Sequence, residues 1–178
     1  MSDAIKVTRL APAGMLSLRI DLSDPAAAAA CGALGLALPG VRRISVGQGG
    51  AAAWMAPDEL LFLVPEAPCA KAGMADALAG RPHLAVDLTD ARVRFRIEGR
   101  GAREVIAKGA PADLRPTAFA AVRDGVGDFR RTRLGQIAAA FWAPGDDVMD
   151  LVCFRSVADH AEAWLRQAAR EGSLPGVL

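Results

Sequence analysis

The eight residues Trp54–Leu61 (WMAPDELL) have a counterpart later in the chain, Trp142–Met149 (WAPGDDVM). In both segments a tryptophan ends a stretch with strand character, proline and acidic residues indicate a turn, and an apolar strand follows. A second echo lies in the same order, because Gly32–Pro39 is similar to Gly109–Pro116. Two echoes in one order predict a tandem duplication of a unit that contains both strands and helices.

The expected elements also repeat, in the order strand, helix, hairpin, strand, helix. Strands are expected at residues 15–21, 41–46, 51–64 (broken near Pro57 and Asp58), 94–98, 129–133, 136–142 and 148–154. Helices are expected at residues 25–34, 68–79, 99–108 and 156–170. We therefore predict the α+β fold class, with two tandem βαβ-like repeats (about 14–80 and 86–172) packed into a single domain (1–178). Its sheets are expected to be antiparallel or mixed, with helices on the outer faces.

Two of these helices carry a start signal. Asp24 and Pro25 supply a cap and a first-turn proline for the first helix, which Gly35 ends. Ser156 and Asp159 form an S-x-x-D pattern, which predicts a capping box at the start of the last helix.

The glycines before Trp54 allow two interpretations. Gly47, Gly49 and Ala52 form a G-x-G-x-x-A pattern with Glu66 about twenty residues on, which is typical of a dinucleotide-binding turn. That turn needs a long helix directly after the glycines, whereas Pro57 has no N–H to donate and would break such a helix early. We therefore predict that the glycines form a hairpin between two strands.

Composition excludes several classes of protein. The chain has 178 residues, of which 52% are hydrophobic, and a formal net charge of +1, so neither nucleic acid nor an anionic membrane is an expected partner. No apolar run approaches the roughly 18 residues of a membrane span, and no secretory leader is visible, which predicts a cytoplasmic protein. Cys31, Cys69 and Cys153 are too far apart for a metal or redox motif and are expected to be small buried hydrophobic residues.

The residues that could carry catalysis have simpler explanations. His83 and His160 lack any metal-ligand spacing and are expected to be surface or packing residues. Ser156, Asp159 and His160 share one helix, which cannot give the geometry of a hydrolase triad. The paired acids Asp58–Glu59 and Asp146–Asp147 are expected to be solvated turn residues. The chain is therefore predicted to have no catalytic, cofactor-binding or metal-binding residues of its own.

Arg92, Arg94 and Arg96 alternate with apolar residues and share one face of a strand. Because a fully buried face would not tolerate three guanidinium groups, that face is expected to meet water or an acidic partner. A partner is favoured, because arginine is enriched at protein interfaces. The interface candidates are Arg92, Arg94 and Arg96 together with Trp54, Asp58 and Glu59.

Several segments, in order, resemble the gamma subunit of heterotetrameric sarcosine oxidase. Trp54–Leu61 resembles its Gly-Pro-Asp-Glu-Trp-Leu-Leu turn, with Ala56 for Gly and Leu60 for Trp. The other similar segments are Val86–Arg92, Gly99–Gly109, Ala110–Leu114, Arg131–Gly135, Phe154–Ala158 and Trp164–Leu165. The resemblance covers roughly residues 14–170 and extends to the folate-binding module of aminomethyltransferases. Those enzymes carry an acidic residue on the strand after the glycine that matches Gly135, where this chain continues with residues 136–140 (QIAAA).

The resemblance implies a small non-catalytic subunit that braces a flavoprotein subunit. It implies that FAD, FMN, NAD, zinc and tetrahydrofolate are held by partner subunits. A large nucleotide-binding subunit would hold NAD and the tetrahydrofolate site, a flavoprotein subunit would hold the substrate flavin and share a covalent flavin with the large subunit, and a further small subunit would bind zinc. The whole assembly would demethylate sarcosine oxidatively, pass the methyl carbon to tetrahydrofolate or release formaldehyde, and form hydrogen peroxide. The duplicated fold also leaves open a stand-alone folate-binding enzyme or regulator of one-carbon transfer, and a homodimer that uses the same surfaces on itself.

Overall fold

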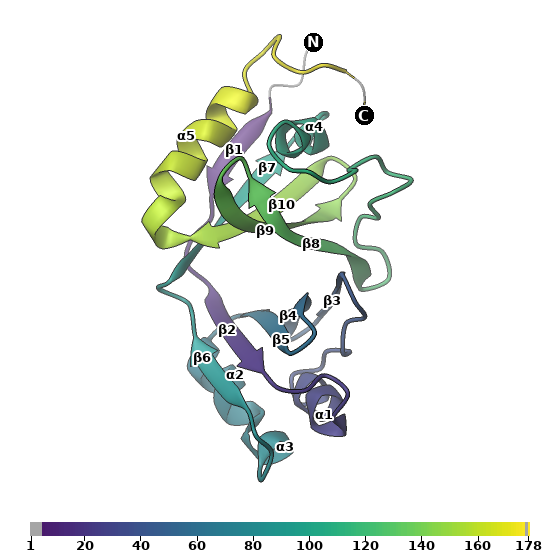
Figure 1. Cartoon of the computed structure of the whole chain (residues 1–178), viewed down its shortest axis with the longest axis vertical. Coiled ribbons are helices and arrows are strands. Elements are labelled where there is room, and N and C mark those ends of the chain that lie inside the picture. The colour runs from purple at the N-terminus through teal and green to yellow at the C-terminus, as the bar shows by residue number, and fades with distance from the viewer. Residues whose placement is uncertain (1–4, 177) are drawn as a thin grey trace.

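Within the described residues, ten antiparallel strands form one sheet that frames the chain (Figure 1). The computed structural model describes residues 5–176 and residue 178. The strands are β1 (Lys6–Arg9), β2 (Gly14–Arg19), β3 (Arg43–Gly47), β4 (Gly50–Ala56), β5 (Glu59–Val64), β6 (Leu84–Asp87), β7 (Arg92–Glu98), β8 (Val126–Leu134), β9 (Ile137–Gly145) and β10 (Val148–Phe154). The helices are α1 (Pro25–Ala33), α2 (Ala67–Gly73), α3 (Ala75–Leu78), α4 (Ala102–Ala107), the 3-10 turn η1 (Arg155–Val157) and α5 (Ala158–Ala168).

The sheet consists of two half-sheets. The first half-sheet has the order β3-β4-β5-β2-β6, and the second has the corresponding order β8-β9-β10-β7-β1. They join where β3 pairs with β8, with Ile44 opposite Gly127 and Ser45 opposite Val126. Every strand pair in the described residues is antiparallel, so the antiparallel alternative of the prediction is confirmed and the mixed one is not seen there.

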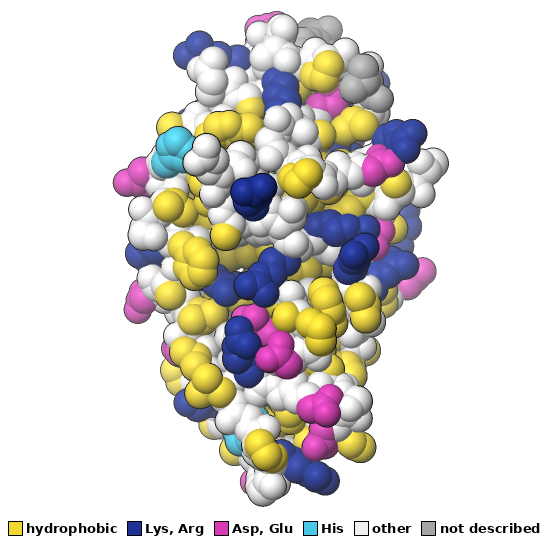
Figure 2. Space-filling view, viewed as in Figure 1, with side chains coloured by type: hydrophobic (Ala, Val, Ile, Leu, Met, Phe, Trp, Pro, Cys, Tyr) yellow, Lys and Arg dark blue, Asp and Glu magenta, His cyan; other side chains and the backbone are white. Residues whose placement is uncertain are grey.

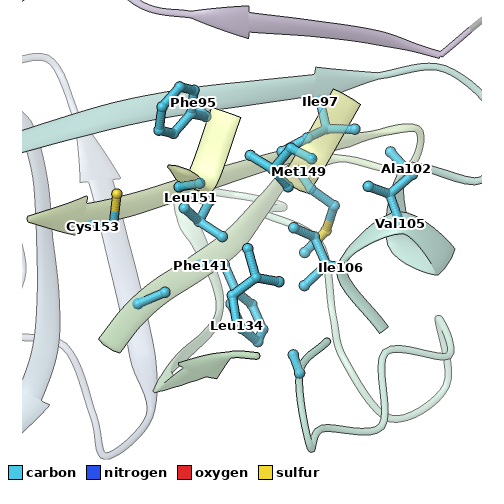
Figure 3. Packing of buried hydrophobic residues seen from close by; sticks show 14 of the residues in the cluster. Phe95, Ile97, Ala102, Val105, Ile106, Leu134, Phe141, Met149, Leu151 and Cys153 are labelled. Carbon is cyan, nitrogen blue, oxygen red and sulfur yellow. The ribbon is translucent and has the colours of Figure 1, made fainter. Parts of the chain in front are cut away.

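The half-sheets face one another, and the helices lie on their outer sides (Figure 1). Helices α1 to α3 cover a first apolar core, and α4 and α5 cover a second one. In the second core, Phe95 and Ile97 of β7 and Leu151 of β10 pack near Val105 and Ile106 of α4 (Figure 3). Each such side chain that leaves water stabilises the fold by about 1.5–3 kcal/mol.

A third cluster lies between the half-sheets, and we call it the inner layer. Its members come from both half-sheets, which shows that the two pack face to face rather than meeting only along the β3–β8 junction. They are Met15, Ile44, Ala51, Ala53, Met55, Leu61, Leu63, Phe129, Ala140, Trp142 and Val152.

The glycine-rich segment is a hairpin, as predicted. Gly47 pairs with Gly50 across the turn, and β4 rather than a helix follows. Gly50 has a φ of +123°, and a Cβ on Gly49 or Gly50 would clash with the backbone carbonyl of Leu34 or Leu63. The glycines are therefore explained by close approach of the backbone and by the turn.

One of the two predicted helix starts is confirmed and the other is wrong. The Asp24 carboxylate accepts a hydrogen bond from the Ala26 N–H at 2.9 Å, and the helix ends before Gly35 with a φ of +67°. Ser156 instead lies within η1, and the cap of α5 is Val157, whose side chain cannot accept a hydrogen bond. The Asp159 carboxylate pairs with Arg9 at 3.0 Å rather than with the helix start.

The predicted helix 68–79 is two short helices, α2 and α3, separated at Met74. The Met74 side chain is fully buried in the first core, where it packs with the helices and the first half-sheet. The break therefore places a buried side chain between two short helices that both contribute to the first core.

Candidate interaction surface

The three arginines of β7 point into the space between the half-sheets. Arg94 lies opposite Val152, a member of the inner layer, and cross-strand partners share a face of the sheet. The alternate residues Val93, Phe95 and Ile97 are buried in the second core. The alternation predicted for this strand is confirmed, and all three arginines are half-buried. Figure 2 shows Lys and Arg side chains gathered at the waist of the molecule, between the two halves.

Arg96 has an acidic partner inside the chain. Its Nε and Nη2 donate hydrogen bonds to the Asp150 carboxylate at 2.7 and 2.9 Å. The Asp150 side chain is only 2% exposed, whereas that of Arg96 is 34% exposed. This bidentate hydrogen bond is the main reason why the pKa of Arg96 is raised. Asp150 was not among the predicted site residues, although a single carboxylate in the otherwise apolar strand 148–154 (VMDLVCF) was a usable signal.

Arg92 and Arg94 form no ion pair within the described residues. The Arg92 guanidinium lies 5.4 Å from the centroid of the Phe154 ring. Burial lowers the pKa of both arginines, and Glu59 and Asp150 respectively oppose that effect through their charges. Within the part of the chain that the structure describes, these two guanidinium groups therefore lose hydration without gaining a carboxylate partner.

Glu59 is a buried acid rather than a solvated turn residue, so that prediction is wrong. It is the first residue of β5, and its carboxylate accepts hydrogen bonds from Ser17 at 3.1 Å and from Arg19 at 3.2 Å. Arg131 of the second half-sheet reaches the same carboxylate at 3.5 Å. The prediction is confirmed for Asp58 and for residues 146–147, which are exposed at the turns. Glu59 thus links the two half-sheets electrostatically.

The tryptophans of the two echoing segments point to opposite faces. Trp54 pairs with Leu60 of the first core, so it lies on the outer face, where it is half-buried. Trp142 pairs with Asp150 on the inner face and stacks on Phe129, with ring centroids 6.0 Å apart. Sequence similarity alone did not distinguish these orientations, because a change of one residue in register reverses the face.

Three hollows follow the arginine row, and together we call them the arginine groove. The smallest, about 50 Å³, is lined by Arg92, Arg131 and Phe154 among others. The next, about 430 Å³, lies among Arg9, Arg92, Arg94, Arg155 and the linker 10–12. The last, about 340 Å³, lies between Arg94, Arg96 and Trp142 on one side and the β3–β4 hairpin on the other. The first two hollows share Arg92 and the last two share Arg94, so the groove runs along the row of arginines Arg92, Arg94 and Arg96 on β7.

Of the remaining candidates, Cys153 lines the smallest hollow, and His83, His160, Cys31 and Cys69 line none of the three. His83 and His160 are both exposed. Cys31 and Cys153 are buried as predicted, but Cys69 is exposed and donates a hydrogen bond to Glu66 at 3.2 Å, so the prediction is wrong for Cys69. Within residues 5–176 and 178, no group of three His, Cys, Asp or Glu side chains is arranged to hold a metal ion. No helix in the same residues has the length and apolar character to cross a bilayer.

Comparison with known proteins gives a consistent result. The sarcosine oxidase gamma subunit family matches residues 19–171. Sarcosine oxidase subunit gamma from an Arthrobacter species is 30% identical over 176 residues, which cover 98% of this chain and 84% of that protein. The protein of the same name from Corynebacterium sp. strain P-1 is 31% identical over 170 residues, covering 94% of this chain and 81% of that protein.

Two solved structures extend the comparison to the fold. One is the heterotetrameric sarcosine oxidase from Corynebacterium sp. U-96 in complex with pyrrole 2-carboxylate, where a chain matches with a TM-score of 0.85 and 28% identity over 98% of this chain and 88% of that one. The glycine cleavage system aminomethyltransferase T from Bartonella henselae matches with a TM-score of 0.64 and 12% identity, over 92% of this chain and 46% of that one. The second likeness concerns the fold alone. With a family match that spans most of the sequence, the chain belongs to the sarcosine oxidase gamma subunit family.

Proposed function

We propose that the chain is a non-catalytic subunit of a cytoplasmic sarcosine oxidase complex and stabilises the flavoprotein subunit of that complex. The observation that carries this proposal is the match of nearly the whole chain to a chain of a heterotetrameric sarcosine oxidase. The complex would demethylate sarcosine oxidatively, deliver the methyl carbon to tetrahydrofolate or release it as formaldehyde, and produce hydrogen peroxide. Following the family resemblance, we assign FAD, FMN, NAD and tetrahydrofolate to the partner flavoprotein and nucleotide-binding subunits, and zinc to a further small subunit.

The interaction surface that we propose includes the arginine row, Trp54 and the Asp58 turn. Arg96 and Glu59 already form ion pairs within the chain, with Asp150 and Arg131 respectively. They would therefore contribute to docking by positioning neighbouring side chains rather than by direct contact. Arg92 and Arg94 form no ion pair in the described part of the chain, and they are our main candidates for contact with another subunit.

The test is co-expression with the flavoprotein subunit from the same genome. We expect the two chains to elute together on gel filtration, and we expect the flavoprotein to unfold at a higher temperature with this chain than without it. An unrelated folded protein of similar size is the control for non-specific protection. Separate elution, with no effect on the flavoprotein, would contradict the proposal, and elution of this chain alone as a dimer would favour the homodimer instead.

A second candidate function is folate binding by the isolated chain. The hollow that contains Trp142 also contains Arg94 and Arg96, which offers a π-surface and cations to an aromatic carboxylate. Titration with tetrahydrofolate should then quench tryptophan fluorescence to saturation, and Trp142→Phe should remove the quenching. A linear response, equal in both proteins, would exclude this function.

We further propose that the two halves arose by duplication, with repeats at about 14–80 and 86–172. The corresponding strand orders of the half-sheets support this proposal. Superposition of β2 to β5 on β7 to β10 would test it, because independent halves would not share both strand direction and connection.

A further inference from the structure

The arginine groove contains more positive charge than the chain itself neutralises. Six arginines line its three hollows: Arg9, Arg92, Arg94, Arg96, Arg131 and Arg155. Asp150 and Glu59 neutralise two of them from inside the fold. Two more pair with acids at the rim, Arg9 with Asp159 at 3.0 Å and Arg155 with Asp90 at 3.7 Å, and both acids are almost fully exposed. Arg92 and Arg94, which neighbouring hollows of the groove share, remain without a carboxylate within the described residues.

The walls of the groove are apolar around these charges. Leu10, Pro12 and Met15 line the largest hollow, and Val46 and Leu63 line the one beside the β3–β4 hairpin. Apolar walls exclude water and so strengthen a charge-assisted hydrogen bond to a guanidinium group. The groove therefore suits an occupant with both carboxylate and apolar groups.

The spacing of the central arginines indicates an extended occupant. Arg92 and Arg94 are two residues apart on one strand, so their attachment points are about 6.6 Å apart. An extended polypeptide has the same repeat, and every second side chain of it points the same way. Each of the two larger hollows exceeds 300 Å³, more than one carboxylate group would fill, and the shared arginine joins them into one path.

We infer that the arginine groove binds an extended segment of a partner subunit that carries carboxylates at alternate positions and apolar side chains between them. This inference rests on the proposed function, because it presumes the subunit complex. Arg92 and Arg94 would form bidentate pairs with two successive carboxylates, while the intervening side chains contact the apolar walls.

The test measures the affinity of this chain for its co-purified flavoprotein partner. Arg94→Glu should weaken binding of the flavoprotein at least tenfold, because losing one member of a desolvated charge pair has an effect of about this size. Arg100→Glu changes the net charge equally on an exposed loop outside the groove and should leave the affinity within about twofold. Raising the salt concentration should weaken binding of the wild-type chain more than that of Arg94→Glu.

The variant Arg94→Met distinguishes the loss of the positive charge from a loss of folding. It keeps most of the length of the side chain, so its circular dichroism spectrum and unfolding temperature should match those of the wild type while binding weakens. If the wild-type chain and both Arg94 variants bind the flavoprotein equally well, the inference is wrong and the proposed function stands. If the wild-type chain forms no complex with the flavoprotein at all, both the proposed function and this inference are wrong.

A cross-linking experiment identifies the occupant directly. Gln48 is exposed and lines one hollow of the groove, so a photo-crosslinking phenylalanine in its place should capture a peptide of the partner subunit. We expect that peptide to contain Asp or Glu at alternate positions. A captured peptide without acidic residues would overturn the inference. Succinate, a free dicarboxylate, serves as a competitor. If it blocks cross-linking at position 48 but leaves the complex intact, the inference is also wrong.

Discussion

Asp150 of β10 and Arg96 of β7 lie directly opposite each other on neighbouring strands, and their bidentate pair has one nearly buried and one accessible end. This asymmetry predicts unequal effects of mutation. Arg96→Met leaves a buried carboxylate without a partner and should lower the free energy of unfolding by about 3 kcal/mol. Asp150→Asn leaves a guanidinium group that water can reach, so its cost should be smaller, about 1–2 kcal/mol. Urea denaturation measures both, and equal losses would contradict this account.

Glu59 and Asp58 are adjacent acids in different environments, which makes them a matched pair. Glu59→Gln removes a buried charge that accepts hydrogen bonds from Ser17 and Arg19, and it should cost about 1.5–3 kcal/mol of stability. Asp58→Asn affects only the exposed pair with Arg19 and should stay within about 0.5 kcal/mol. Thermal unfolding of the two variants measures the difference. A larger loss of stability in Asp58→Asn than in Glu59→Gln would contradict the prediction.

Two glycine substitutions should change stability in opposite directions. Gly50→Ala places a methyl group against the backbone of Leu63 at a φ of +123°, so we expect a loss of more than about 2 kcal/mol. Gly32 lies within α1 with open space around it, so Gly32→Ala should stabilise the chain by about 0.5–1 kcal/mol. A stable Gly50→Ala variant would show that the β3–β4 hairpin can adopt another turn.

Stability should fall at alkaline pH because of two buried thiols. Burial raises the pKa of Cys31 and of Cys153 from 9.0 to about 11, while the charge of Arg9 slightly opposes this at Cys153. Between pH 9 and 11 the unfolded thiols lose protons and the folded ones keep them, so the free energy of unfolding decreases as the pH rises. Each thiol contributes a slope of about 1.4 kcal/mol per pH unit.

The control for this prediction is the double variant Cys31→Ala and Cys153→Ala. Its free energy of unfolding starts lower because of the missing volume, but it should depend less steeply on pH in the same window. The chain contains no tyrosine, so no phenol titrates there. Parallel curves for the two proteins would mean that the thiols are not responsible.

The long strands and the first helix could be predicted from the sequence because each carries its own signal. Alternation in β7, the Pro57–Asp58 turn and the Asp24 cap all depend on neighbours in sequence. Strands β1 and β6 were not predicted, since each has four residues and becomes a strand only by pairing with β7 or β2. The predicted cap at Ser156 failed for the same reason, because its partner Asp159 instead binds Arg9, which is distant in sequence.

The candidate surface was predictable in its composition but not in its pairing. The sequence places three arginines on one face of β7. It does not show that Asp150 neutralises Arg96, nor that Arg92 and Arg94 have no such partner among residues 5–176 and 178. From the sequence alone Glu59 is assigned to a turn, whereas the register shows that it begins β5 and faces Arg131 of the other half-sheet. Register decides which side chains meet, and tertiary pairing sets the register.

The position of β1 has a consequence for the synthesis of the chain. Lys6 to Arg9 pair with residues 95–98, at the far edge of the second half-sheet. Strand β1 leaves the ribosome before its partner β7 and therefore cannot dock until the middle of the sequence has followed it, and such distant pairing is slow to form. Moving residues 5–12 behind α5, which contacts β1, would give a circular permutant that completes its halves one after the other. We expect that permutant to refold faster than the natural order of the chain.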